Sequence, residues 1–284
     1  GCTSKFLPEI DEYDELIVVE ALLTNESEGN YVRLSRTVPI GITGISSPVV
    51  NAYIYVKDDL ERIGVFNEER PGYYIIDSEY FPGEEGRTYT LFIDVEGREY
   101  VSDPMLMSEV QPIDSLYADF EYREDAIYPP LYSYTIYFDA HDPSINNKYF
   151  RWTYEEVWEY HLPWHYPPDY KRICWLTENS SDIIIKNNST LEYSIIEKFP
   201  LHQVDNRSSS RLFQKYSILL RQYSISEKEY IFWESMREMT EEQGGLYDPV
   251  PQPLTGNITC IDDPAEPVLG FFSVSAVSKK RLFI

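Results

Sequence analysis

The first hundred residues contain short apolar stretches of two kinds. Residues 16–23 are nearly all apolar, which is typical of a covered strand, whereas residues 31–36 and 50–57 alternate apolar and polar side chains, as in a strand with one face in solvent. The strands predicted in this way are 16–23, 31–36, 50–57, 73–76, 88–95 and 98–102. Turn residues such as Pro71-Gly72 and Glu96-Gly97 separate them. We therefore expect a small β-sandwich over residues 15–107.

A second series of strands is predicted beyond residue 108. Pro104 and Pro112 bracket a segment with little strand periodicity, and we place a domain boundary there. The strands predicted after it are 116–122, 132–140, 149–157, 171–177, 181–186, 194–199, 212–223 and 269–277. Trp152 is expected to pack between the sheets that they form. Residues 108–284 are therefore predicted to be a second β-rich, sandwich-like domain.

One helix is predicted inside this second domain, at about residues 226–243. Ser226 and Glu229 have the spacing of a capping box, and Tyr230, Trp233 and Met236 fall on one helical face. Gly244-Gly245 supplies a stop. The predicted fold class is mainly β, with two β-sandwich-like domains and one inserted α-helix.

The charge of the chain excludes some partners. A formal net charge of −24 repels the phosphates of nucleic acids, so we expect no nucleic-acid partner. The acidic residues occur in scattered pairs, which are typical of a solvated surface, and no calcium-binding loop motif is present, so we expect neither a metal nor a cofactor. No run of about 18 apolar residues suggests a helix that spans a bilayer.

Cys2 is the residue that points to a membrane. It stands at the start of the sequence, after Gly1, and residues 3–14 are mostly polar and acidic. A cysteine in this position is typical of a bacterial lipoprotein whose signal peptide has been removed, and two or three acyl chains hold a protein stably on a bilayer. We expect residues 1–14 to be a lipidated tether. The alternative is a chain that merely begins near a cysteine.

Cys174 and Cys260 form the remaining pair of cysteines. In the oxidising compartment expected for a lipoprotein, they could form a disulfide that closes a long loop. The alternative is two buried free thiols, which pack as small apolar side chains.

An aromatic segment near the middle of the chain is the candidate binding site. Its residues are Trp158, Tyr160, His161, Trp164, His165 and Tyr166. The four-residue spacing of the two histidines would suit metal ligands on a helix, but three prolines argue against a helix there. One hypothesis is an exposed loop that stacks against sugar rings or a partner protein. The other is a long β-hairpin tip folded onto a small core.

No catalytic motif stands out in the sequence. It contains no nucleophile elbow, zinc-protease helix, phosphate-binding loop or dinucleotide fingerprint. We expect a protein that is not an enzyme. A hydrolase site in the second domain is a third possibility, and it would require a concave pocket that holds a histidine or paired carboxylates.

Several stretches occur in an order that resembles a known family. They are Cys2, 16–24, 31–36, 48–54, 112–116, Cys174-Trp175, 222–226 followed by Tyr230 and Trp233, 256–258 and 267–273. Together they resemble the Bacteroidota outer-membrane lipoproteins of the domain-of-unknown-function 4249 family. Residues 71–74 and 86–91 also resemble the prealbumin-like, carboxypeptidase-regulatory type of β-sandwich, which is immunoglobulin-like in architecture.

The resemblance implies a role at the outer membrane, on its cell surface or its periplasmic face. Such proteins are typically encoded beside SusC-like TonB-dependent transporters, so we expect a non-enzymatic accessory or ligand-binding component in nutrient uptake. Its expected partners are outer-membrane lipid through Cys2, a β-barrel transporter, and a glycan or peptide ligand. The alternative is a glycan-binding or adhesive lipoprotein that acts at the surface without a transporter. The family implies no catalytic residue.

Overall fold

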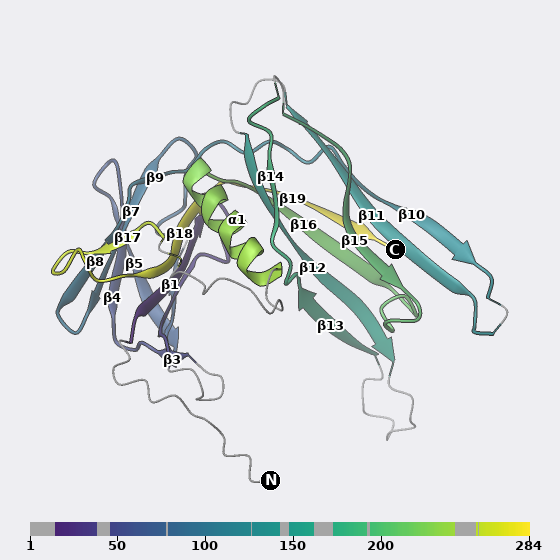
Figure 1. The fold of residues 1–284 in the computed structure, drawn as a ribbon, viewed down its shortest axis with the longest axis horizontal. Helices are drawn as coiled ribbons and strands as arrows, with labels where there is room; N and C mark the ends of the chain where they lie inside the picture. Colours follow the sequence, from purple (N-terminus) through teal and green to yellow (C-terminus); the bar gives the residue numbers. More distant parts are fainter. Residues whose placement is uncertain are drawn as a thin grey trace, which may run out of the picture.

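The computed structural model describes residues 15–38, 46–77, 79–125, 127–142, 148–161, 173–191, 194–241, 254 and 256–284 (Figure 1). Its first strands are β1 (Ile17–Thr24), β2 (Tyr31–Arg36), β3 (Ser47–Pro48), β4 (Tyr53–Asp58), β5 (Ile63–Arg70), β6 (Tyr73–Ile76), β7 (Thr88–Val95), β8 (Arg98–Ser102) and β9 (Met105–Leu106). The later elements are β10 (Ser115–Arg123), β11 (Leu131–Asp142), β12 (Tyr149–His161), β13 (Ile173–Asn179), β14 (Ile184–Asn187), β15 (Ser194–Asp205), β16 (Tyr216–Ser224), α1 (Glu227–Glu241), β17 (Ile258–Cys260), β18 (Leu269–Ser275) and β19 (Val277–Phe283).

The fold is mainly β, and α1 is the single helix of the described residues, as predicted. Four predicted strands coincide with β2, β6, β7 and β8. In β7 every second side chain is buried, because one face of the strand lies on the core and the other faces outward. Each large apolar side chain buried in this way contributes about 1.5–3 kcal/mol.

The first sandwich is built from both ends of the chain. Its strands follow the order β17-β8-β7-β4-β5-β6-β2-β1-β18, with β3 beside β2 and β9 beside β7. Strand β18 pairs in parallel with β1, and its Phe271, Phe272 and Val274 are buried in the same core as Val19 and Leu23. The predicted boundary at residue 107 is therefore wrong for β17 and β18, because their apolar faces complete the first core.

Asn257 joins the two terminal strands of this order. Its side-chain amide donates a hydrogen bond to the carbonyl of Phe272 at 2.9 Å and accepts one from the Phe272 N–H at 2.8 Å. Gly270 has a φ of +97°, and a Cβ there would lie 1.9 Å from the carbonyl oxygen of Val19. This close approach requires glycine. The first sandwich therefore closes upon itself at β17 and β18.

The second sandwich packs two sheets face to face. The sheet β10-β11-β15 covers the sheet β13-β12-β16-β19, in which β14 also pairs with β12. Trp152 is fully buried between them, with ring centroids 5.3 Å from those of Phe138 and Phe199. The prediction for Trp152 is confirmed.

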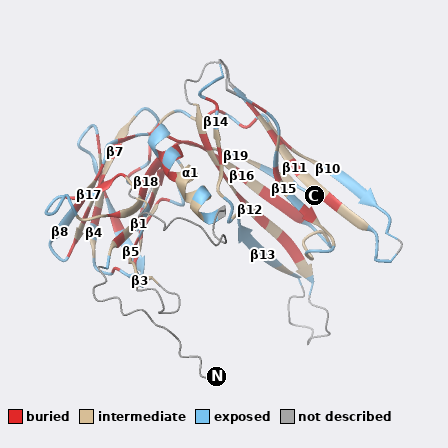
Figure 2. Ribbon diagram, in the orientation of Figure 1, coloured by how far each residue is buried: buried red, intermediate tan, exposed pale blue. Residues whose placement is uncertain are grey.

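Helix α1 lies at the junction of the two sandwiches (Figures 1 and 2). Phe232 packs into the first core, while the ring of Tyr230 lies 5.4 Å from Tyr149 of β12. Ser226 caps the helix, since its Oγ accepts a hydrogen bond from the Glu229 N–H at 3.1 Å. The helix starts one residue after the predicted start, and residues 242 and 243 lie outside the described residues. In the part of the chain that the structure describes, no helix has the length and hydropathy needed to cross a membrane.

Candidate functional site

A cleft of ≈ 500 Å³ lies between the two sandwiches. On one side it is lined by the β1–β2 loop and by Tyr31 and Tyr73. On the other side it is lined by the outward faces of β12, β16 and β19, with Arg151, Arg221 and Lys279. Because both sandwiches supply walls, the relative placement of the two determines the shape of the cleft.

Asn30 holds the β1–β2 loop in a defined conformation. Its buried Oδ1 accepts hydrogen bonds from the Thr24 N–H at 2.7 Å and from the Thr24 hydroxyl at 2.8 Å. Its Nδ2 donates to the carbonyl of Glu26 at 3.1 Å. Buried hydrogen bonds of this kind fix a loop, since breaking them leaves polar groups unpaired. The loop is therefore a preformed wall of the cleft.

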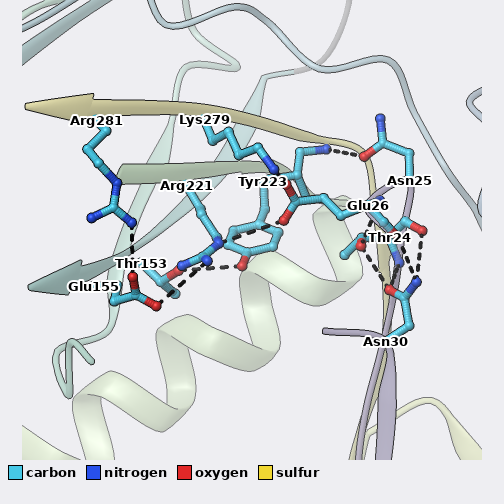
Figure 3. A network of polar contacts seen from close by, with 11 residues as sticks. Thr24, Asn25, Glu26, Asn30, Thr153, Glu155, Arg221, Tyr223, Lys279 and Arg281 are labelled. Carbon is cyan, nitrogen blue, oxygen red and sulfur yellow. Dashed lines mark hydrogen bonds and ion pairs between the residues drawn. The ribbon is translucent and has the colours of Figure 1, made fainter. Parts of the chain in front are cut away.

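The β1–β2 loop also contacts the second sandwich through a hydrogen bond and ion pairs (Figure 3). Asn25 Oδ1 accepts a hydrogen bond from the Val277 N–H at 2.9 Å. The carboxylate of Glu26 pairs with Lys279 and lies 3.7 Å from Nε of Arg221. Two cations thus face one carboxylate that is mostly shielded from solvent, which strengthens their attraction.

A row of charged side chains continues along the outward face of the second sandwich. Glu155 on β12 lies 3.9 Å from Arg221 on β16 and 3.1 Å from Arg281 on β19. Thr153 donates a hydrogen bond to the Tyr223 hydroxyl at 3.4 Å in the same region. The carboxylate on β12 is therefore paired with guanidinium groups on β16 and β19.

Tyr31 and Tyr73 form an aromatic pair at the mouth of the cleft. Their rings are stacked with centroids 5.4 Å apart, and the Arg70 guanidinium lies 4.3 Å from the Tyr73 ring. The Tyr31 hydroxyl donates a hydrogen bond to Glu20 at 2.6 Å. Burial, and next the negative charge of Glu20, raise the pKa of Tyr31, so it stays a neutral hydrogen-bond donor. The pair also borders a second depression of ≈ 600 Å³ on the same face.

Arg151 lines the cleft, and Glu229 lies behind it, where α1 meets β12. The Arg151 guanidinium lies 4.1 Å from the ring of Trp233, and Glu229 is fully buried and accepts a hydrogen bond from Trp233 Nε1 at 3.2 Å. Burial raises the pKa of Glu229, although the charge of Arg151 opposes the rise. The predicted capping residue Glu229 thus points into the junction.

We expect Glu229→Gln to stabilise the protein at high pH relative to the natural chain. A raised folded pKa gives a contribution that is fully present below the ordinary value and lost as pH rises through the folded value. Glutamine never ionises, so the difference in melting temperature between variant and natural protein should grow from pH 4 to pH 8. The exposed Glu227→Gln on the same helix is the control. A difference in melting temperature that is the same at every pH would contradict a raised pKa of the buried Glu229 carboxyl.

The comparison with protein families identifies this chain. Residues 3–281 match the family described as domain of unknown function DUF4249. The chain belongs to this family. The match covers both sandwiches and the helix, so the two-sandwich arrangement with its cleft lies within one family domain. A search of curated proteins finds no match.

Only part of the predicted aromatic site lies on the surface of the protein. Trp158 is buried on the inward face of β12, and the Arg211 guanidinium lies 4.8 Å from its ring, which contradicts the exposed-loop hypothesis for this residue. Tyr160 is half-buried, and His161 is exposed with Nε2 2.5 Å from Glu159. The other predicted members, Trp164, His165 and Tyr166, lie outside the described residues, as does Cys2. Strands β12 and β13 pair antiparallel, which favours the hairpin hypothesis.

Cys174 and Cys260 are free thiols, so the disulfide that they could have formed is absent. Cys174 is half-buried on β13 of the second sandwich, whereas Cys260 is fully buried on β17 of the first. The return of residues 258–260 to the first sandwich separates the two. Cys260 thus packs as a small apolar side chain, as the alternative predicted.

Reasoning from the sequence missed a charged cluster inside the second sandwich. Glu156 is 3% exposed and accepts a hydrogen bond from the Tyr216 hydroxyl at 2.8 Å. Its Oε1 also lies 3.2 Å from His202 Nε2 and 3.4 Å from Arg211 Nε. Glu156 falls on the inward side of the β12 alternation with Trp152, which is the signal that could have found it. Within the described ranges, no group of three or more His, Cys, Asp and Glu side chains is arranged to hold a metal ion.

Proposed function

We propose that this protein is a non-enzymatic, lipid-anchored binding component of the outer membrane that serves beside a TonB-dependent transporter in nutrient uptake. Membership of the DUF4249 family supports the setting. The observation that carries the binding role is the cleft, which is lined by side chains of both sandwiches. Tethering through Cys2 would raise the effective concentration of the protein beside a transporter in the same membrane, so a weak contact between them suffices.

The lining of the cleft favours a neutral, polar ligand. Glu26 already pairs with Lys279 and Arg221, so an anionic ligand would compete with this carboxylate for the two cations. Hydroxyl and amide side chains such as Ser180 and Asn179 line the same cleft. Together with the Tyr31 ring, they offer hydrogen-bonding groups beside an apolar face. A sugar is complementary to this surface, because it has both hydroxyl groups and an apolar ring face. We therefore take an uncharged oligosaccharide as the ligand class.

We expect Tyr31→Ala to weaken oligosaccharide binding by at least about fivefold, since removing a central aromatic anchor typically costs more than about 1 kcal/mol of binding free energy. The measurement is a glycan array followed by titration of the best neutral sugar. Tyr53→Ala, an exposed tyrosine on β4 away from the cleft, is the matched control and should bind normally. Normal binding by the Tyr31 variant, with an unchanged melting temperature, would place the ligand elsewhere.

The partner is tested separately. The full-length lipidated protein should co-purify from native outer membranes with a β-barrel transporter, and mass spectrometry should find acyl chains on Cys2. Sugar binding without any co-purifying transporter would favour the alternative, a glycan-binding surface lipoprotein. An unmodified Cys2 thiol in material from the native host would contradict the anchor.

A further inference from the structure

The open edges of the sheets differ in how well they are protected. An edge strand exposes unpaired backbone N–H and C=O groups, so natural proteins cover it or interrupt it. In the first sandwich, Asn257 joins the terminal strands β17 and β18. At the β19 edge of the second sandwich, Ser278 accepts a hydrogen bond from the Ile113 N–H at 3.2 Å, and Lys280 contacts the carbonyl of Asp114. These edges are closed by the chain itself.

The two edges of the three-stranded sheet are interrupted or charged. Strand β15 contains Pro200, which donates no backbone hydrogen bond, and Lys198 with a positive φ of 45°. Its register against β11 shifts twice. Strand β10 carries Asp119, Glu121 and Arg123 on its exposed end. Both edges thus have the features that discourage pairing with a further strand.

Strand β13 lacks the proline, the positive φ and the register shifts of β15, and Glu178 is its single charged residue. It is seven residues long, contains no proline or lysine, and keeps an unbroken register with β12 from Ile173 to Asn179. No residue of β13 is fully buried, and Figure 2 colours the strand as largely exposed. Its second edge has no backbone partner among the residues that the structure describes.

The exposed apolar side chains of β13 also suit the binding of a further strand. Ile173 and Trp175 are about half exposed on the face toward the cleft, at 51% and 54%, and Leu176 is 45% exposed on the opposite face. Apolar side chains on both faces would pack against alternate residues of an added strand, while the backbone would supply its hydrogen bonds. A loop that contacts only solvent would gain no stability from exposed apolar side chains on both faces.

We propose that β13 is a docking edge for an extended, basic segment of a partner protein, which adds to the sheet as a further strand. The charge of the chain selects this occupant. A second copy would bring another formal charge of −24 to the contact, whereas a segment with lysine or arginine at its ends would be attracted. Asp182, exposed just beyond the end of β13, is the carboxylate for such residues, whereas Glu178 already pairs with Arg211.

The test uses the full chain and a synthetic nine-residue peptide of alternating valine and threonine with a lysine at each end, followed by hydrogen–deuterium exchange. A peptide at about ten times its Kd should slow exchange of the β13 amides by about tenfold and leave the β15 amides unchanged. The same peptide with glutamate ends should protect less at low salt. Equal protection at β13 and β15, or no protection at about 1 mM peptide, would overturn the proposal.

Two variants keep the result specific to the edge. Trp175→Lys places a charge on an exposed side chain of β13, so the fold should persist while protection by the peptide is lost. Ile195→Lys on the β15 edge is the matched control and should leave protection intact. Unchanged protection in Trp175→Lys would overturn strand addition. If the natural protein dimerises with increasing concentration and Trp175→Lys abolishes this, the occupant of the β13 edge is a second copy. That result would overturn the proposal of a basic partner.

Discussion

Replacing Glu156 with leucine is expected to lower the free energy of unfolding by about 3–5 kcal/mol, the cost of removing one partner from a buried ion pair. The carboxylate lies in the second sandwich with Tyr216, His202 and Arg211 around it. Without it, the buried Tyr216 hydroxyl loses its partner and the Arg211 guanidinium keeps only Glu178, and leucine cannot replace the lost contacts. Urea unfolding of the variant and the natural protein gives the difference directly.

The matched control is Glu155→Leu, one residue earlier on the opposite face of β12. Glu155 also pairs with arginines, but it is closer to solvent, so its loss should cost no more than about 1 kcal/mol. Equal effects of the two substitutions would mean that burial adds nothing to the Glu156 contacts.

Glu156 should also give the protein an acid-sensitive stability. Burial acts to raise the pKa of Glu156, but contacts with His202 and Tyr216 outweigh it and leave the pKa below its ordinary value of about 4.5. A lowered folded pKa gives stability that is fully present above the ordinary value and lost as pH falls through the folded value. The urea midpoint of the natural protein should therefore fall more steeply below about pH 4.5 than that of Glu156→Leu.

The second large effect is expected for Trp152→Ala, which should cost about 3–5 kcal/mol through the cavity that it leaves. Trp152 is fully buried and contacts the rings of Phe138 and Phe199. Its Nε1 donates a hydrogen bond to Gln222 at 2.8 Å, and Gln222 in turn donates to the carbonyl of Gln111 at 2.6 Å. The substitution therefore also loosens the segment that links the two sandwiches.

The exposed Trp175→Ala provides the comparison for that measurement. Its side chain is half in solvent, so its removal should change the unfolding free energy by no more than about 0.5 kcal/mol. Both variants are measured by urea unfolding with the same slope. A loss below about 1 kcal/mol for Trp152→Ala would mean that the second core is loosely packed.

The local pattern of apolar and polar residues was enough to predict most strands. Burial of one face of a strand requires an apolar side chain at every second position. Strands β6 and β7 follow this two-residue period from end to end, and β2 and β8 follow it over part of their length. Strand β5 was missed, since its second half is charged and exposed, and residues 269–277 were predicted as one strand although the chain divides at Ala276 into β18 and β19. Nothing local marks a residue at which a strand changes from one sandwich to the other.

The pairing of distant strands and the cleft could not be predicted. Strand β18 pairs with β1 across about 250 residues, and only the folded core reveals that their apolar faces meet. The cleft is formed by side chains such as Glu26, Arg221 and Lys279, which in sequence are indistinguishable from ordinary surface charges. The two hypotheses for Trp158 could not be distinguished for the converse reason. Its aromatic neighbours suggested a loop, whereas its place in the β12 alternation puts it in the core.

The binding role rests on the cleft being the place where a ligand touches both sandwiches at once. The direct measurement is a crystal structure of the protein with the neutral oligosaccharide that binds best on the array. We expect the sugar to lie between Tyr31 of the first sandwich and the outward face of β12 and β16 in the second. A sugar bound at the tip of the β12–β13 hairpin, or to one sandwich alone, would contradict this account.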